Sequence, residues 1–100
     1  MIVELHEAAS AELDDAAVWY EGQRAGLGHS FAREVMAAAA KIGEFPNTWP
    51  RWPDREEIRV VRVKRFPYFL PYVLRGDRAV VVAVAHDRRR RGYWIDDREF

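Results

Sequence analysis

Apolar and polar residues alternate along several short segments of the chain, and this period of two predicts strands. Residues 2–6 alternate in this way and open the chain. Residues 57–64 and 69–74 are also strand-like. A turn at Gly76 leads from them into residues 79–85, which are apolar on both faces, as is typical of a strand in the middle of a sheet.

Two irregularities interrupt these strand patterns. Valines at positions 60, 61 and 63 break the alternation of their segment, which indicates a bulge. Pro71 cannot donate a hydrogen bond to a neighbouring strand, so we expect it at an edge-facing or bulged position.

Between the first strand and the others, apolar residues recur every three or four positions, which predicts two helices. Residues 7–22 carry an apolar stripe with acidic residues opposite it, and residues 27–45 carry a second stripe. Glycines between them end one helix and begin the next. The alanine run at 37–40 allows another helix to approach closely, so the two helices are expected to form an antiparallel hairpin.

The predicted order of elements is β-α-α-β-β-β in a single domain that covers residues 1–100. This is an α+β fold in which a two-helix antiparallel hairpin packs on one face of a small, mostly antiparallel four-stranded sheet. Residues 46–53 contain three prolines and cannot be regular structure, so Trp49 and Trp52 are expected to hold this loop against the core.

The composition excludes several classes of protein. The chain has no cysteine, which excludes disulfides and thiolate metal sites. His6, His29 and His86 are far apart and lack the spacing of metal ligands, so we expect neither a metal nor a cofactor. No apolar run approaches the ~18 residues that cross a bilayer, which favours a cytoplasmic protein without a membrane partner.

The net charge of zero hides a strong segregation of charge. Residues 1–50 carry a net charge of −5 and residues 51–100 carry +5. Within residues 59–94, ten Lys or Arg residues face two Asp residues. A basic, β-rich surface of this kind suits a polyanion or an acidic partner.

The blocks of sequence around these charges resemble the RelE/ParE family of bacterial toxins, and the ParE-like branch most closely. The resemblance covers nearly the whole chain, in family order, although Arg91 stands where family members commonly have a proline. Its residues are Trp19, Tyr20, Glu21, Arg24, 26–28, Phe31, Glu34, Arg59, 65–68, Tyr72, 83–86, Arg88, Arg89, 92–94 and Arg98.

The resemblance implies the toxin half of a type II toxin–antitoxin pair, neutralised by a cognate antitoxin. In the ParE-like branch the toxin poisons DNA gyrase and need not catalyse a reaction. On this interpretation, target-binding residues are Arg59, Lys64, Arg65, Arg88 and Arg89. The antitoxin is expected to lie along the helical hairpin at Trp19, Tyr20, Phe31 and Val35.

A RelE-like mRNA endonuclease that acts on the ribosome is the alternative. Metal-free cleavage of RNA needs a proton acceptor, a proton donor and cations for the phosphate. His86, Tyr93 and Arg89 are the candidate catalytic residues under this alternative only. Both interpretations require Arg65, His86, Arg89 and Tyr93 to share one surface, on which the toxin would bind its cellular target.

Each of these residues also has a structural interpretation. His86 ends a strand and can be a hydrogen-bonded structural residue, and the run at 88–91 can be a solvated turn. Trp94 is expected to pack inward and anchor the tail. A plain RNA- or DNA-binding module would explain the basic surface but not the helix blocks.

Overall fold

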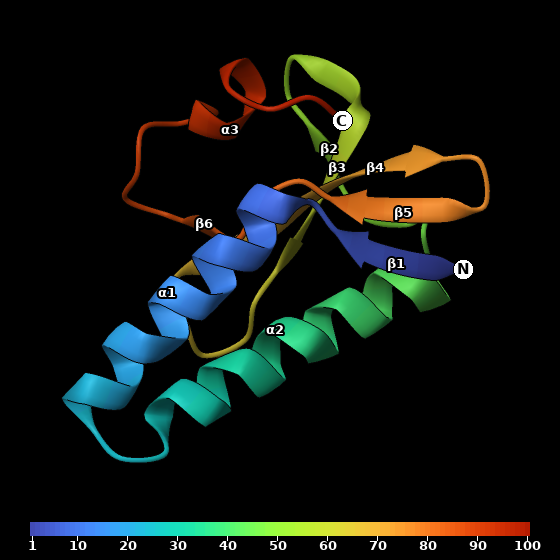
Figure 1. The fold of residues 1–100 in the computed structure, drawn as a ribbon. Helices are drawn as coiled ribbons and strands as arrows, with labels where there is room; N and C mark the ends of the chain where they lie inside the picture. The colour runs from blue at the N-terminus through green and yellow to red at the C-terminus, as the bar shows by residue number, and fades with distance from the viewer.

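The computed structural model describes all of residues 1–100, and a six-stranded sheet organises them (Figure 1). The sheet has the order β1-β5-β4-β3-β2, and β6 pairs with β4. Only the pairing of β1 with β5 is parallel. The strands are β1 (Ile2–Leu5), β2 (Arg51–Trp52), β3 (Arg55–Arg62), β4 (Tyr68–Arg75), β5 (Arg78–Val81) and β6 (Ala85–His86).

The predicted α+β class and order of elements are confirmed, with two differences in the sheet. Two short strands, β2 and β6, add to the four that were expected. The segment expected as one strand over residues 79–85 is divided into β5 and β6, and residues 82–84 lie between them. The sheet therefore has a break beside β4.

The break in the sheet accounts for Pro71. This residue is fully buried in β4, between β3 and β5, so the expectation of an edge position is wrong. Its carbonyl accepts a hydrogen bond from the backbone N–H of Val82, which shows that its nitrogen faces residues 82–84. Because the neighbouring strand is interrupted there, no ladder hydrogen bond is lost.

The bulge predicted from the valines at 60, 61 and 63 is absent between β3 and β4, whose register is regular from Ile58 to Arg62. Val61 and Val63 pack in one core cluster and Val60 packs against the other. Both faces of the sheet are covered, so both faces of β3 are apolar. Arg59 and Arg62 consequently lie on opposite faces.

The helical hairpin consists of α1 (Glu7–Gln23) and α2 (Leu27–Glu44), which lie side by side in Figure 1 and project beyond the sheet. The N-cap residue of α2 is Gly26, which has no side chain to accept the free backbone N–H groups of the first turn. Instead, the Glu21 carboxylate at the end of α1 accepts the backbone N–H groups of Gly26 and Gly28 at 2.8 and 3.0 Å. These hydrogen bonds lower the pKa of Glu21 and fix the turn.

Two core clusters lie on opposite faces of the sheet. The first packs α1 and α2 against side chains such as Leu70 and Tyr72 of β4. The second packs the C-terminal segment, which includes the short α3 (Tyr93–Asp96), against Val73 and Ile58. The predicted packing of Trp94 and Trp52 is confirmed, since they are 0% and 9% exposed. The C-terminal segment therefore forms a second layer on the sheet.

Candidate functional site

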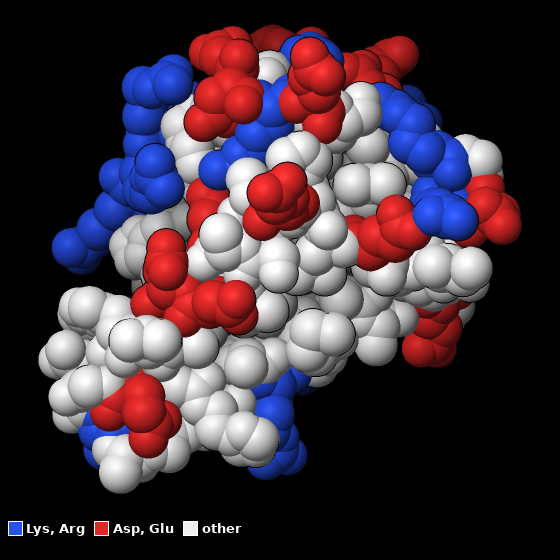
Figure 2. Space-filling view, in the orientation of Figure 1, with Lys and Arg blue, Asp and Glu red and all other residues white.

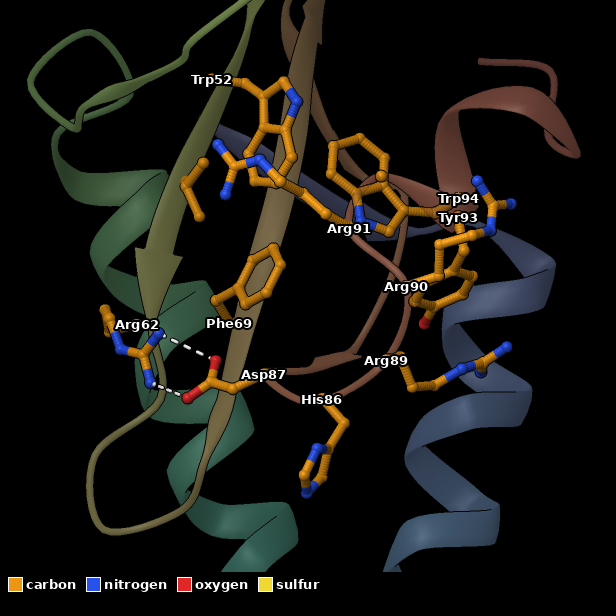
Figure 3. Close-up of a pocket in the computed structure, with 12 residues that line it drawn as sticks. Trp52, Arg62, Phe69, His86, Asp87, Arg89, Arg90, Arg91, Tyr93 and Trp94 are labelled. Atoms are coloured by element: carbon orange, nitrogen blue, oxygen red, sulfur yellow. Dashed lines mark hydrogen bonds and ion pairs between the residues drawn. The ribbon is translucent and has the colours of Figure 1, made fainter.

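A hollow of about 300 Å³ lies on the face of the sheet that carries the C-terminal segment (Figure 3). Strands β2, β3 and β4 form one side of it, and the segment from β6 to α3 forms the other. Its lining residues are Trp52, Val60, Arg62, Phe69, His86, Asp87, Arg89, Arg90, Arg91, Gly92, Tyr93 and Trp94. The hollow is therefore aromatic on the sheet side and basic on the side of the loop.

Aromatic rings form the sheet side of the hollow. Trp52 and Phe69 stack with their centroids 5.8 Å apart and 19° between their planes. Trp94 meets Trp52 edge-on at 5.0 Å. The guanidinium of Arg91 lies over the Trp52 ring, 4.4 Å from its centroid, in a cation–π contact.

An ion pair closes the lower edge of the hollow, as the dashed lines in Figure 3 show. Arg62 Nη1 and Nη2 donate to the two carboxylate oxygens of Asp87 at 2.9 and 2.6 Å. These hydrogen bonds lower the pKa of the Asp87 carboxyl and raise the pKa of Arg62. The pair fixes the start of the arginine-rich loop to β3.

The Tyr93 side chain is turned away from solvent and is only 6% exposed. Its hydroxyl donates to Glu12 Oε2 on α1, and the Arg89 guanidinium covers its ring at 3.8 Å from the centroid. Burial, followed by the hydrogen bond to Glu12, raises the pKa of the Tyr93 phenol. The phenol is therefore protonated, buried and already hydrogen-bonded.

Glu12 is the centre of a polar cluster that the sequence did not reveal. Its carboxylate accepts Arg98 Nη1 and Nη2 at 2.9 and 2.7 Å, the Val84 backbone N–H at 3.0 Å, and the Tyr93 hydroxyl. Four donors meet one carboxylate, which offers about four acceptor positions. The cluster attaches the C-terminal segment to α1.

His86 lies at the border between two hollows and serves the backbone locally. Its Nδ1 accepts the backbone N–H of Arg88 at 3.0 Å, which leaves Nε2 as the protonated nitrogen of the neutral ring. The ring meets Tyr68 edge-on, with the centroids 4.9 Å apart. In Figure 3 the imidazole points away from Phe69 and Arg91.

The remaining predicted target-binding residues lie elsewhere. Arg65 occupies the turn between β3 and β4 and approaches Glu34 of α2 at 3.6 Å. Arg59 donates to the Trp49 carbonyl at 2.8 Å on the helical side of the sheet. Neither these residues nor Lys64 line the hollow. The expectation that Arg65 joins His86, Arg89 and Tyr93 on one surface is therefore wrong.

The predicted antitoxin-binding residues divide into exposed and buried sets. Trp19 is 59% exposed and, with Tyr20, lines a second hollow of about 450 Å³ together with Pro67, Tyr68, His86 and Arg88. Phe31 and Val35 are fully buried in the first core cluster. Direct contact of Phe31 or Val35 with a partner is excluded in this conformation, which corrects the expectation for these two.

The charge distribution agrees with the segregation in the sequence. Figure 2 shows a group of Lys and Arg side chains where the segment between β6 and α3 runs, and Asp and Glu side chains among uncharged surface along the helical hairpin. Arg89 and Arg90 approach Glu12 and Asp96 at 3.7 and 3.8 Å, whereas Arg88 and Arg91 form no ion pair. The free cations of the loop are therefore Arg88 and Arg91.

The structure contains no cluster of three or more His, Asp or Glu side chains that could hold a metal ion. None of its helices combines the length and the apolar character that crossing a membrane requires.

Comparison with known proteins identifies the family. The sequence profile described as "ParE toxin of type II toxin-antitoxin system, parDE" matches residues 3–91. The chain belongs to the ParE toxin family. The fold also resembles a solved structure of the chromosomal ParDE toxin–antitoxin system from P. aeruginosa, with a TM-score of 0.65 and 14% identity over 86% of this chain and 95% of that chain. A search among curated proteins found no match.

Membership of the ParE family confirms the predicted resemblance and the class of type II toxin. Glu12, Asp87 and Phe69 were missed as site residues. Glu12 stood among several acids on one helix, and only the low exposure of its side chain, 16%, distinguishes it. In the sequence Phe69 is an ordinary strand residue and Asp87 an ordinary loop acid. Only the contacts of Phe69 with Trp52 and of Asp87 with Arg62, both distant along the chain, place them in the hollow.

Proposed function

We propose that this ParE-family toxin arrests growth by binding DNA gyrase, without cleaving RNA, and that a cognate antitoxin neutralises it. The observation that carries the proposal is the burial of the Tyr93 hydroxyl, which donates to Glu12 and is covered by Arg89. A phenol held in this way is not placed to exchange a proton with a substrate.

The imidazole of His86 supports the same conclusion. General acid–base catalysis requires a donor or acceptor within about 3 Å of the reacting atom. His86 lines the same hollow as Arg89 and Tyr93, but its Nδ1 is engaged by the Arg88 N–H and its ring points away from Phe69 and Arg91. Because Glu12 also holds the Tyr93 hydroxyl, the three candidate catalytic residues do not present a proton donor and a proton acceptor together to a phosphate.

The basic loop is instead suited to binding. Arg88 and Arg91 are exposed and free of ion pairs, so a partner with negative charge would not have to displace an internal carboxylate. Complementary charge raises the rate of association and the specificity more than it raises the affinity. The proposed gyrase contact lies on this loop, at Arg88 and Arg91, with Arg89 beside them.

The antitoxin is proposed to cover the exposed apolar part of the helical hairpin. Val18 and Trp19 on α1 are 74% and 59% exposed, and Met36 on α2 is 53% exposed. A groove beside Trp19 suits the apolar face of a partner helix. Such a partner would also reach Arg88, which lines the same hollow as Trp19, and would compete with the target there.

The experiment is to induce the chain alone and to compare DNA double-strand breaks with the rate of protein synthesis. With purified gyrase, the toxin is expected to increase the amount of cleaved DNA complex and to reduce supercoiling. His86→Asn separates the two mechanisms, because Asn can accept the Arg88 N–H as His86 does but has no imidazole. The variant is expected to retain toxicity.

Cleaved transcripts and a rapid stop of translation, both lost in folded His86→Asn, would overturn the proposal in favour of the nuclease. Arg88→Gln with Arg91→Gln is expected to weaken the inhibition of gyrase. Arg33→Gln with Arg51→Gln is the matched control, since it removes two exposed arginines outside the loop.

A further inference from the structure

The hollow beneath the arginine loop contains a donor that the protein does not use. The indole nitrogen of Trp94 is buried and has no hydrogen-bond partner. Buried N–H groups are usually paired, so each unpaired one calls for an explanation. Trp94 lines the hollow, and Figure 3 shows its nitrogen on the side that faces the other labelled residues.

A flat aromatic surface lies beside this donor. Phe69 is half-buried and lines the hollow, and its ring stacks nearly parallel to that of Trp52, with an angle of 19° between the two planes. Arg91 already occupies the face of Trp52. The face of Phe69 remains the open part of the surface and can stack against a planar ligand.

The charge of the hollow selects for an anion. Four of its lining residues are arginines and one is an aspartate, which gives a net charge of +3. Asp87 is held by Arg62, and Arg89 and Arg90 lie near acids outside the hollow. Arg91 is exposed and forms no ion pair, so its side chain can move from Trp52 towards a ligand without the loss of an ion pair.

We propose that this hollow binds one nucleotide unit, with the base on Phe69, a base acceptor atom on the Trp94 N–H, and the phosphate on Arg91. The Trp94 nitrogen is buried in this structure, so binding requires side chains that line the hollow to move and expose it. The volume of about 300 Å³ is at the lower end of ligand pockets, about 300–1,000 Å³, so the hollow has room for a single unit. The unit belongs either to a free nucleotide or to a single strand.

The proposed nucleotide site is independent of the gyrase proposal, because it is formed by residues of the toxin alone. Titrations therefore use the purified full-length chain without gyrase, and a failure here leaves the gyrase proposal intact. The probes are thymidine monophosphate, thymidine, inorganic phosphate and a short single strand of oligothymidylate.

The readout is the indole N–H signals of the four tryptophans in an NMR spectrum. Trp52 and Trp94 line the hollow, whereas Trp19 lines another and Trp49 donates to the Lys41 carbonyl. Thymidine monophosphate is expected to shift the Trp94 signal most and to leave Trp49 unchanged. It is expected to bind more tightly than either thymidine or phosphate.

Two variants test the two halves of the ligand. Phe69→Leu keeps the apolar bulk but removes the ring, and it is expected to weaken binding by about fivefold or more, as loss of a stacked base does. Phe45→Leu, at an aromatic residue that is 52% exposed outside the hollow, is the control and is expected to change nothing. Arg91→Gln is expected to reduce the affinity for the nucleotide to that for thymidine.

Tighter binding of the strand than of the mononucleotide would assign the unit to single-stranded nucleic acid, and equal binding would assign it to a free nucleotide. Both results support the site. Equal affinity for phosphate and thymidine monophosphate would overturn it, as would a shift at Trp19 without one at Trp94. Full binding by folded Phe69→Leu would also overturn it.

Discussion

The Glu12 carboxylate should contribute more to stability than any other charged group in this protein. Glu12→Gln leaves a side chain of nearly the same shape but with one acceptor oxygen in place of two. Four donors, from Tyr93, Arg98 and Val84, meet the carboxylate in the native chain. About two of them would face the new NH₂ group, and each unpaired buried donor costs about 1–3 kcal/mol.

The loss of charge adds to this cost, because the side chains of Glu12 and Arg98 are only 16% and 8% exposed. Removing one partner of a buried ion pair costs about 3–5 kcal/mol. The expected decrease in the free energy of unfolding is therefore about 3 kcal/mol or more, against a total of about 5–15 kcal/mol. For a domain of this size the midpoint temperature should fall by at least about 12 °C.

Urea unfolding, followed by tryptophan fluorescence, measures this change. Asp15→Asn is the control, since Asp15 is an exposed acid on the same helix without an ion pair, and it should stay within about 0.5 kcal/mol of the wild type. Arg98→Gln should also destabilise the chain. The double variant should lose about 1–3 kcal/mol less than the sum of the two. A loss below about 1 kcal/mol in Glu12→Gln would refute the reasoning, because it would mean that water replaces the lost contacts.

Three further predictions concern other parts of the fold. Gly28→Ala should destabilise the chain, because an added Cβ would collide with the backbone carbonyl of Ala17. Gly22→Ala lies on open helix surface and should stabilise the chain by about 0.5–1 kcal/mol. Thermal unfolding of the two variants measures this difference. Burial raises the pKa of Tyr68 to about 12, so the folded state favours the protonated phenol. The free energy of unfolding should therefore fall as the pH rises from 10.0 towards 12. Tyr68→Phe should make this fall smaller in unfolding experiments. The pKa of Asp87 is lowered, so the stability that its carboxylate contributes should be lost as the pH falls below 3.8. Asp87→Asn should lower the free energy of unfolding by less than about 1 kcal/mol at neutral pH, since the ion pair with Arg62 is largely exposed. A larger loss in urea unfolding would contradict this.

The sequence predicted most of the fold because the periodicity of apolar residues reports on local structure. Both long helices begin where expected, and their predicted ends lie within a residue of Gln23 and Glu44. The division of the last strand was not predicted, because the apolar run continues without a polar residue through 82–84. Only the pairing of Pro71 with Val82 shows where the ladder stops.

The site was predicted in part. The run at 88–91 and Tyr93 were recognised as candidates; residues 89–91 and Tyr93 do line one hollow, whereas Arg88 lines the other. Arg65 was grouped with them on charge alone, but it lies beside Glu34. A pattern of charge along the chain does not specify which side of a sheet each side chain occupies.

The sequence by itself determined the class of fold, the order of the elements, the concentration of positive charge near the C-terminus and the resemblance to the RelE/ParE family. Each of these depends on neighbours along the chain or on the identity of the residues. Only the tertiary structure decided that the Tyr93 hydroxyl is enclosed, that Arg62 holds Asp87, and that Trp52 and Phe69 form one surface. The physical reason is distance along the chain: Arg98 meets Glu12 across 86 positions, and such a contact follows from packing between layers.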